Sequence, residues 1–215
     1  MLPKIDFKSL KTANVADKRA VIEDLIRKTG RVGAENVIGF LSSTDFYSAP
    51  ASTKYHSSYK EGLVNHCLTV LGVMDDYRQA WIKNDPSLAQ VLTDDKLIVC
   101  SLLHDICKTN LYVQREKMTK NERGDWTTTL GYVCSDSFPI GHGEKSVIML
   151  QAIGFNLFPD EMLAIRYHMG FWGDLGGDVN ASLQKAIEMS PLVTLMQVAE
   201  FTASNVFETR NFVNK

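Results

Sequence analysis

Hydrophobic residues recur every three or four positions over most of the chain, which is the spacing of helices that bury one face. The clearest case is residues 59–83, where Leu63, Cys67, Val70 and Met74 share one helix face. The predicted fold class is therefore all-α, a helical bundle. The predicted helices span residues 14–28, 34–41, 59–83, 93–105, 144–153, 159–168, 181–188 and 190–207.

Residues 111–138 interrupt the helical pattern. Val113, Trp126 and Tyr132 favour strands, and residues 121–125 carry a turn signal. We expect a small β-hairpin insertion that stands over the helical body, as a substrate lid or as a dimer contact.

The chain is long enough for one domain with an appendage. It has 215 residues, 45% of them hydrophobic and 22% charged, which is normal for a globular protein with a core. We expect residues 1–33 to form an N-terminal helical extension packed on a domain that covers residues 34–215.

Charge and cysteine usage exclude several classes of protein. A net charge of −2 argues against an extensive nucleic-acid surface, although it leaves room for a small phosphorylated substrate or a strand end. The longest apolar run, residues 97–103, is too short to span a membrane, and residues 1–11 do not resemble a signal peptide. No cysteines form a C-x-x-C pair, so we expect a reduced, cytoplasmic compartment.

The adjacent pair His104-Asp105 is the sharpest local feature, because it ends an apolar run on a helix that should be buried. A buried carboxylate must be paired or bind a metal. Alternatively, Asp105 caps a neighbouring helix and His104 bonds a carbonyl. Lys108 lies four positions after His104, which predicts the same helix face. There it would point toward a metal-bound phosphate, or stabilise the helix C-terminus.

For each of the other histidines and for one glutamate, the sequence around it fits a structural role as well as a metal-binding role. His66 has apolar neighbours and suits a core position as well as a metal site. His142 lies between two glycines, just before a predicted helix, and His168 ends another. Glu200 lies among small and apolar residues, where a carboxylate either needs a partner or faces solvent. Imidazole is a common ligand of divalent ions.

The order of these residues along the chain resembles the HD phosphohydrolase superfamily. It is most similar to the H…HD…H…H…D subgroup, which includes the HD domain of bacterial 3′-to-5′ exoribonucleases, and to small stand-alone HD proteins of bacteria and phages. The resemblance covers roughly residues 45–204 and departs at Glu200, where the family usually has Asp. Its motifs lie at residues 59–66, 102–108, 138–146 and 166–170.

The resemblance implies two adjoining metal sites. One divalent ion would be held by His66, His104, Asp105 and Glu200. Asp105 would bridge to a second ion held by His142 and His168. These ligands do not distinguish among Mn, Fe, Mg, Ni and Zn as the bound metal.

The resemblance also implies roles around the metals. Lys108 would hold a phosphate oxygen, with help from Arg166 or Lys145. His56, in the loop before the first ligand helix, either protonates the leaving oxygen or is a surface histidine. The longer side chain of Glu200 would shift the carboxylate and weaken metal binding.

Three functions follow as hypotheses. The first is a metal-dependent phosphohydrolase that acts on a nucleotide or a nucleic-acid 3′ end through a metal-activated hydroxide. The second is an HD-fold di-iron oxygenase, and the third is a catalytically weakened nucleotide-binding module. We expect a small phosphorylated substrate such as a nucleotide as the partner, with no membrane and no extensive nucleic-acid surface, and we leave a homo-oligomer open.

Overall fold

The computed structural model describes residues 2–121, 123–170 and 177–208. The described residues form eight α-helices and one antiparallel pair of strands, which confirms the predicted helical body with a β-hairpin. The elements are α1 (Val15–Lys28), α2 (Ala34–Ser43), α3 (Gly62–Asn84), α4 (Asp94–Leu103), β1 (Tyr112–Lys120), β2 (Trp126–Cys134), α5 (His142–Ala152), α6 (Pro159–Arg166), α7 (Gly177–Met189) and α8 (Pro191–Thr202).

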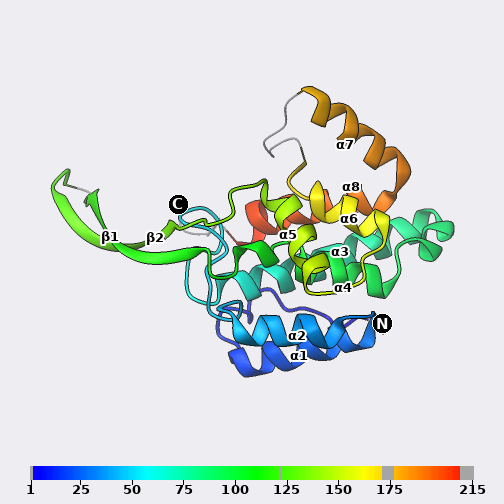
Figure 1. The fold of residues 1–215 in the computed structure, drawn as a ribbon, viewed down its shortest axis with the longest axis horizontal. Coiled ribbons are helices and arrows are strands. Elements are labelled where there is room, and N and C mark those ends of the chain that lie inside the picture. The colour runs from blue at the N-terminus through cyan, green and yellow to red at the C-terminus, as the bar shows by residue number, and fades with distance from the viewer. Residues whose placement is uncertain (1, 122, 171–176, 209–215) are drawn as a thin grey trace.

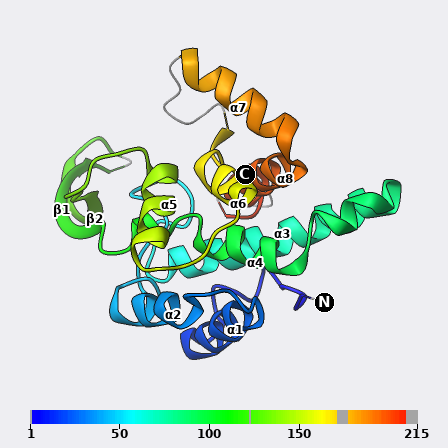
Figure 2. The same cartoon turned by 45° about the vertical axis from the view of Figure 1, so that its right-hand side comes forward.

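The helices are arranged in layers around α3 and α4. Figures 1 and 2 show α1 and α2 on one side of this central pair, and α6 and α8 on the other, with α7 outermost. All of the residues from Leu97 to Leu103 in α4 are buried, as are those from Gly62 to Met74 in α3. Because both helices are buried nearly all round, any polar side chain that they carry into the centre needs a partner.

The start of α3 differs from the prediction. The helix begins at Gly62 rather than near residue 59, because the preceding loop folds back onto it. A Cβ atom at Gly62 would lie 1.9 Å from the carbonyl oxygen of Ser57, so only glycine allows this approach. The loop that carries His56 is thereby held against the N-terminus of α3.

The end of α4 also differs from the prediction, with a consequence for Lys108. The helix ends at Leu103, and Ile106–Lys108 forms a separate 3-10 turn. Asp105 leaves helical geometry with φ −107° and ψ 19°. The prediction that Lys108 lies on the same α-helical face as His104 is therefore wrong.

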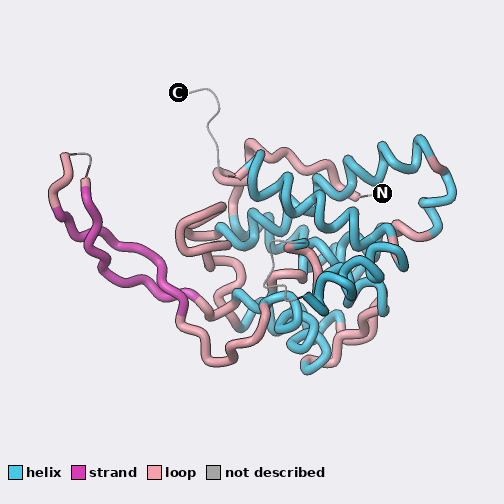
Figure 3. Tube along the Cα trace, turned by 90° about the horizontal axis from the view of Figure 1, so that it is seen from above, coloured by secondary structure: helices cyan, strands magenta, loops and turns pink. Residues whose placement is uncertain are grey.

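The hairpin projects away from the helices. Tyr112 pairs with Cys134 at its base and Lys120 with Trp126 near its tip. Figures 1 and 3 show it extending sideways from the helical body, rather than standing over it. Trp126 and Leu130 are 64% and 66% exposed. Its function as a lid or as a dimer contact stays a prediction.

The N-terminal residues share one core with the rest of the chain. Ile22, Leu25 and Ile26 of α1 belong to the same cluster of buried side chains as the later helices. Arg31, which is 8% exposed, pairs with Glu161 of α6 through two bonds of 3.1 and 2.6 Å. These contacts pack the first 33 residues on the remainder, while their status as an extension stays a prediction. No helix among the described residues is long and apolar enough to cross a membrane.

Breaking the Arg31–Glu161 pair should destabilise the fold. Replacing Glu161 with Gln removes one of the two carboxylates that contact the buried guanidinium and leaves Asp95, at 2.5 Å, as the other, so we expect a cost of about 2 kcal/mol. We expect urea unfolding to show that loss. Glu35→Gln, which breaks the exposed pair between Arg27 and Glu35, should cost less than about 1 kcal/mol. Equal losses in the two variants would contradict the structural role of Arg31.

Thiol reactivity should report the burial of the cysteines. Cys134 is exposed, whereas Cys67, Cys100 and Cys107 are buried. Burial raises the pKa of each buried thiol, that of Cys107 to about 12, and the thiolate is the reactive form. A thiol reagent should therefore modify one cysteine per native chain and four after denaturation. Cys134→Ser should abolish the native reaction, and a second fast thiol in the native protein would contradict the described packing.

Candidate metal centre

Five segments of the chain bring their polar side chains to one buried place. His66 lies on α3, His104-Asp105 directly follows α4, and Glu200 lies on α8. His142 begins α5, and His168 follows the end of α6. His66, His104 and Asp105 are fully buried, and Glu200 is 4% exposed. Residues spread over 135 positions of sequence therefore share one interior site.

The first cluster consists of His66, His104, Asp105 and Glu200. The Nε2 atoms of His66 and His104 are 3.1 Å apart. Oδ2 of Asp105 lies 3.4 and 3.2 Å from these two nitrogens, and Oε2 of Glu200 lies 3.1 and 3.4 Å from them. Ligand atoms about 2.1 Å from a common ion lie about 3.0 to 3.4 Å from each other. The spacing of this cluster therefore fits one divalent ion.

The second ring nitrogen of each buried histidine is already bonded. Nδ1 of His104 lies 2.9 Å from the carbonyl oxygen of Ser101, and Nδ1 of His168 lies 2.7 Å from that of Ile165. A carbonyl can only accept, so each Nδ1 donates and carries the proton in the neutral ring. Each Nε2 then presents a lone pair to the site, which is the tautomer that binds a metal.

The second cluster consists of His142, His168 and the other oxygen of Asp105. The Nε2 atoms of the two histidines are 3.1 Å apart. Oδ1 of Asp105 lies 4.0 Å from Nε2 of His142 and 3.7 Å from Nε2 of His168. Asp105 thus turns one oxygen toward each cluster, which is the arrangement of a bridging carboxylate.

A glycine allows the second cluster to form. A Cβ atom at Gly143 would lie 2.3 Å from the carbonyl oxygen of Arg166. Glycine therefore lets the start of α5 approach the end of α6, which brings His142 to His168. This contact gives the glycines around His142 a packing reason that the sequence alone did not supply.

The carboxylates of the site lack ordinary hydrogen-bond partners. Among the described residues, neither Asp105 oxygen nor Oε2 of Glu200 accepts a hydrogen bond, although all three atoms are buried. Lys108 forms an ion pair with Oδ2 of Asp105 at 2.6 Å. Buried carboxylate oxygens beside the Nε2 atoms of imidazole rings are the donor set of a divalent cation. The clusters can therefore hold a metal ion.

Charges within the site shift the pKa values of its groups. Burial raises the pKa of Asp105 and Glu200. Lys108, His104 and His66 together outweigh burial at Asp105, and His66 and His104 together outweigh it at Glu200, so both pKa values lie well below their usual range. Burial lowers the pKa of His66, but Glu200 and Glu208 raise it well above its ordinary value. The first cluster therefore attracts positive charge, as a proton or as a metal ion.

His56 lies beside the first cluster and forms a further possible metal-binding group with His66 and Glu200. Its ring centroid is 4.8 Å from that of His66, and its buried Nε2 has no hydrogen-bond partner among the described residues. Burial lowers the pKa of His56 to about 4. A neutral ring is a hydrogen-bond acceptor, whereas a general acid must first be protonated. A phosphate anion beside the ring would raise its pKa, and the general-acid role stays a prediction.

The predicted phosphate-binding cations are already paired. Arg166 lies 2.5 Å from Oε1 of Glu144, and Lys145 lies 2.5 Å from Oδ1 of Asp136. Lys108 is the cation that contacts a predicted metal ligand directly. To hold a phosphate oxygen, its ammonium group must share or leave Asp105. The described contacts thus bring Lys108 to the site and give Arg166 and Lys145 other partners.

Glu208 is a member of the site that the sequence analysis missed. After α8, residues Ala203–Phe207 form a π-helical turn, which brings Glu208 back toward α3. Its Oε1 lies 2.9 Å from Nδ1 of His66, and its Oε2 accepts a 2.7 Å bond from Ser57. A carboxylate that orients a metal-binding imidazole raises the basicity of the ligand. No spacing in the sequence indicated this contact, because it depends on how the chain turns after the last helix.

Removing the carboxylate of Glu208 should weaken metal binding. Glu208→Gln keeps the size of the side chain but loses the charge that orients His66, and such losses typically cost about tenfold or more in affinity. Isothermal titration of the metal-free protein with Mn²⁺ or Zn²⁺ should show this change. Glu188→Gln, at an exposed position of α7, should bind as the unmodified protein does. Identical affinities in both variants would contradict the contact.

Comparisons of the chain with protein-family models, with curated proteins and with solved structures found no match. The resemblance to HD phosphohydrolases therefore rests on this chain alone. It consists of the order of the histidines and acidic residues along the chain and the motifs around them, and it stays a prediction.

Proposed function

We propose that the chain is a metal-dependent phosphohydrolase, a phosphomonoesterase or phosphodiesterase that acts on a nucleotide or a nucleic-acid 3′ end. The observation that carries the proposal is the position of Asp105. Its two buried oxygens face two different histidine pairs, so one carboxylate can serve two neighbouring ions. Paired divalent ions favour displacement at phosphorus, because they stabilise both the attacking and the leaving oxygen.

The proposed division of labour follows the contacts. His66, His104, Asp105 and Glu200 would hold one ion, and Asp105, His142 and His168 a second. Bound divalent ions would supply Lewis acidity, which makes water a stronger nucleophile near neutral pH and polarises the phosphoryl group. The second cluster has fewer protein ligands than the first, which leaves positions for water and for a phosphate oxygen.

The chain's own residues would hold charge and protons during hydrolysis. Water gives up a proton as its oxygen forms a bond to phosphorus, the bond from phosphorus to the ester oxygen breaks, and the released alkoxide takes up a proton to become the alcohol. Lys108 would neutralise charge that builds on the phosphoryl oxygens. Nε2 of His56, which lacks a partner among the described residues, would contact either the attacking water or the ester oxygen.

The same set of ligands would also suit a different chemistry. Histidine and carboxylate ligands also suit iron, so a di-iron oxygenase shares the same first requirement. Hydrolysis of a phosphate ester with Mn²⁺ or Mg²⁺ in the absence of oxygen separates the two functions. We favour the hydrolase because Lys108 places a cation at the bridging carboxylate, where an anionic substrate would bind.

Asp105→Asn tests the proposed function. The amide cannot bridge two cations, so we expect metal content to fall and chelator-sensitive hydrolysis to drop at least 100-fold, about 2.7 kcal/mol in the barrier. Metal quantification and a panel of nucleotides and aryl phosphates measure both. Asp125→Asn, in the hairpin turn, should retain metal and rate. Full activity in a well-folded, metal-free Asp105→Asn protein would exclude the mechanism.

A further inference from the structure

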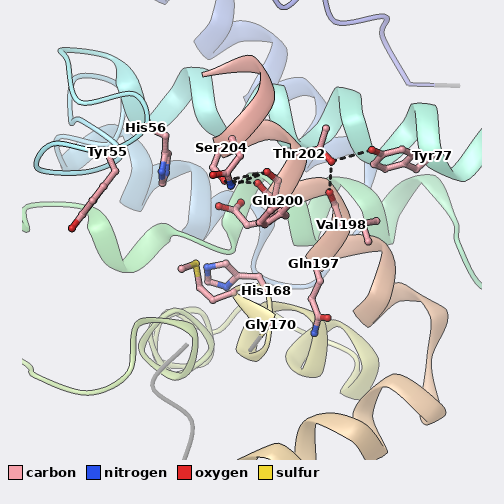
Figure 4. Close-up of a pocket in the computed structure, with 13 residues that line it drawn as sticks. Tyr55, His56, Tyr77, His168, Gly170, Gln197, Val198, Glu200, Thr202 and Ser204 are labelled. Carbon is pink, nitrogen blue, oxygen red and sulfur yellow. Dashed lines mark hydrogen bonds between the residues drawn. The ribbon is translucent and has the colours of Figure 1, made fainter. Parts of the chain in front are cut away.

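A large cavity adjoins the candidate metal centre. It has a volume of about 1040 Å³ and runs along one side of α8, with the carboxylate of Glu200 and the ring of His168 on its wall. Figure 4 shows these two side chains and His56 around the same cavity. A phosphate group alone fills a small part of this volume, whereas ligand pockets for whole small molecules span about 300–1000 Å³.

The face of α8 explains how the metal centre and the cavity are joined. Gln197 lies three and four positions before Glu200 and Phe201, and Ser204 lies four and three positions after them, so these side chains lie toward one side of the helical segment. All four side chains line the cavity. A ligand bound beside Glu200 would therefore extend along the cavity wall that is formed by the neighbouring turns of α8.

Two buried polar groups lie at the end of the cavity that adjoins the metal centre. Nε2 of His56 and Oε2 of Glu200 are buried and accept no hydrogen bond among the described residues. Both side chains line the cavity. This end of the cavity therefore suits the charged part of a ligand.

The polar groups farther along the wall are already bonded within the protein. The amide nitrogen of Gln197 donates to the carbonyl oxygen of Tyr167 at 3.0 Å. Thr202 donates to the carbonyl oxygen of Val198 at 2.7 Å, and its hydroxyl lies 3.0 Å from that of Tyr77. Figure 4 shows the bonds of Thr202 to Val198 and Tyr77 on the side of Glu200 that faces away from His56. Since these hydroxyls are satisfied, this wall offers the ligand mainly apolar surface.

Phe201 provides a ring in that apolar part. It follows Glu200 directly in sequence, lines the cavity and is 53% exposed. An exposed aromatic side chain beside a charged site is suited to stacking on a planar ring. Val198 and Met169 add further apolar surface to the same cavity.

We propose that the cavity binds the ring-bearing alcohol of a phosphate ester, such as a nucleoside, with the phosphate at the metal centre and the ring against Phe201. This inference rests on the proposed phosphohydrolase function for the placement of the phosphate. It predicts that the protein hydrolyses ring-bearing phosphate esters in preference to small aliphatic ones. The side chains on the surface of α8, rather than the metal ligands, would determine this preference.

Substrate discrimination in Phe201→Ala tests the inference. The measured quantity is the ratio of kcat/KM for adenosine monophosphate or 4-methylumbelliferyl phosphate to kcat/KM for glycerol phosphate, with Mn²⁺ present. We expect this ratio to fall at least tenfold, chiefly through KM for the ring-bearing ester, and Phe201→Tyr to restore it. Val206→Ala, in the same segment but outside the cavity lining, should leave the ratio unchanged. If the ratio falls for adenosine monophosphate alone, the cavity binds a nucleoside. If it falls for both ring-bearing esters, the cavity binds planar rings in general.

A ratio that stays unchanged in Phe201→Ala would overturn the inference, and so would equal losses on all substrates. Failure of the proposed function looks different, because the unmodified protein with metal would then hydrolyse none of these esters. In that case, calorimetric binding of adenosine and of 4-methylumbelliferone, which carry no phosphate, decides the matter. Binding that Phe201→Ala weakens at least tenfold would support the ring site by itself, and absence of binding would overturn it.

Discussion

The buried carboxylate of Asp105 is the constraint on which the rest of the structure depends. It has no exposed surface, and its nearest charged neighbours are Lys108 at 2.6 Å and the imidazole of His104 at 3.2 Å. Removing a carboxylate from water costs several kcal/mol unless positive charge compensates it. The four histidines of the two clusters present their Nε2 atoms around this group. A divalent ion between these atoms would supply positive charge to the carboxylate and the imidazoles together.

Much of the surrounding fold serves to hold these imidazoles in one orientation. Carbonyl oxygens at Ser101 and Ile165 fix the rings of His104 and His168, and the carboxylate of Glu208 does the same for His66. The π-helical turn after α8 is what allows one segment to supply both a candidate ligand and an orienting group. The same segment lines the cavity, so metal binding and ligand recognition share one structural support.

The sequence predicted the features that depend on local pattern and missed those that depend on how distant segments meet. Helical periodicity located the helices, and the strand-favouring residues located the hairpin. The set of histidines with Asp105 and Glu200 was predicted from its order along the chain, and the structure brings these side chains together. Glu208 was missed, and Lys108 was placed on the wrong element, because both positions depend on where the chain leaves a helix. The direction of the hairpin likewise depends on tertiary packing rather than on its own residues.

Anomalous scattering from crystals grown with Mn²⁺ tests the central claim most directly. The account predicts a peak about 2.0–2.3 Å from Nε2 of His66, Nε2 of His104 and one oxygen each of Asp105 and Glu200. A second peak should lie on the side of Asp105 that faces His142 and His168. Crystals that show no manganese at this centre, with Lys108 still bound to Asp105, would contradict the account.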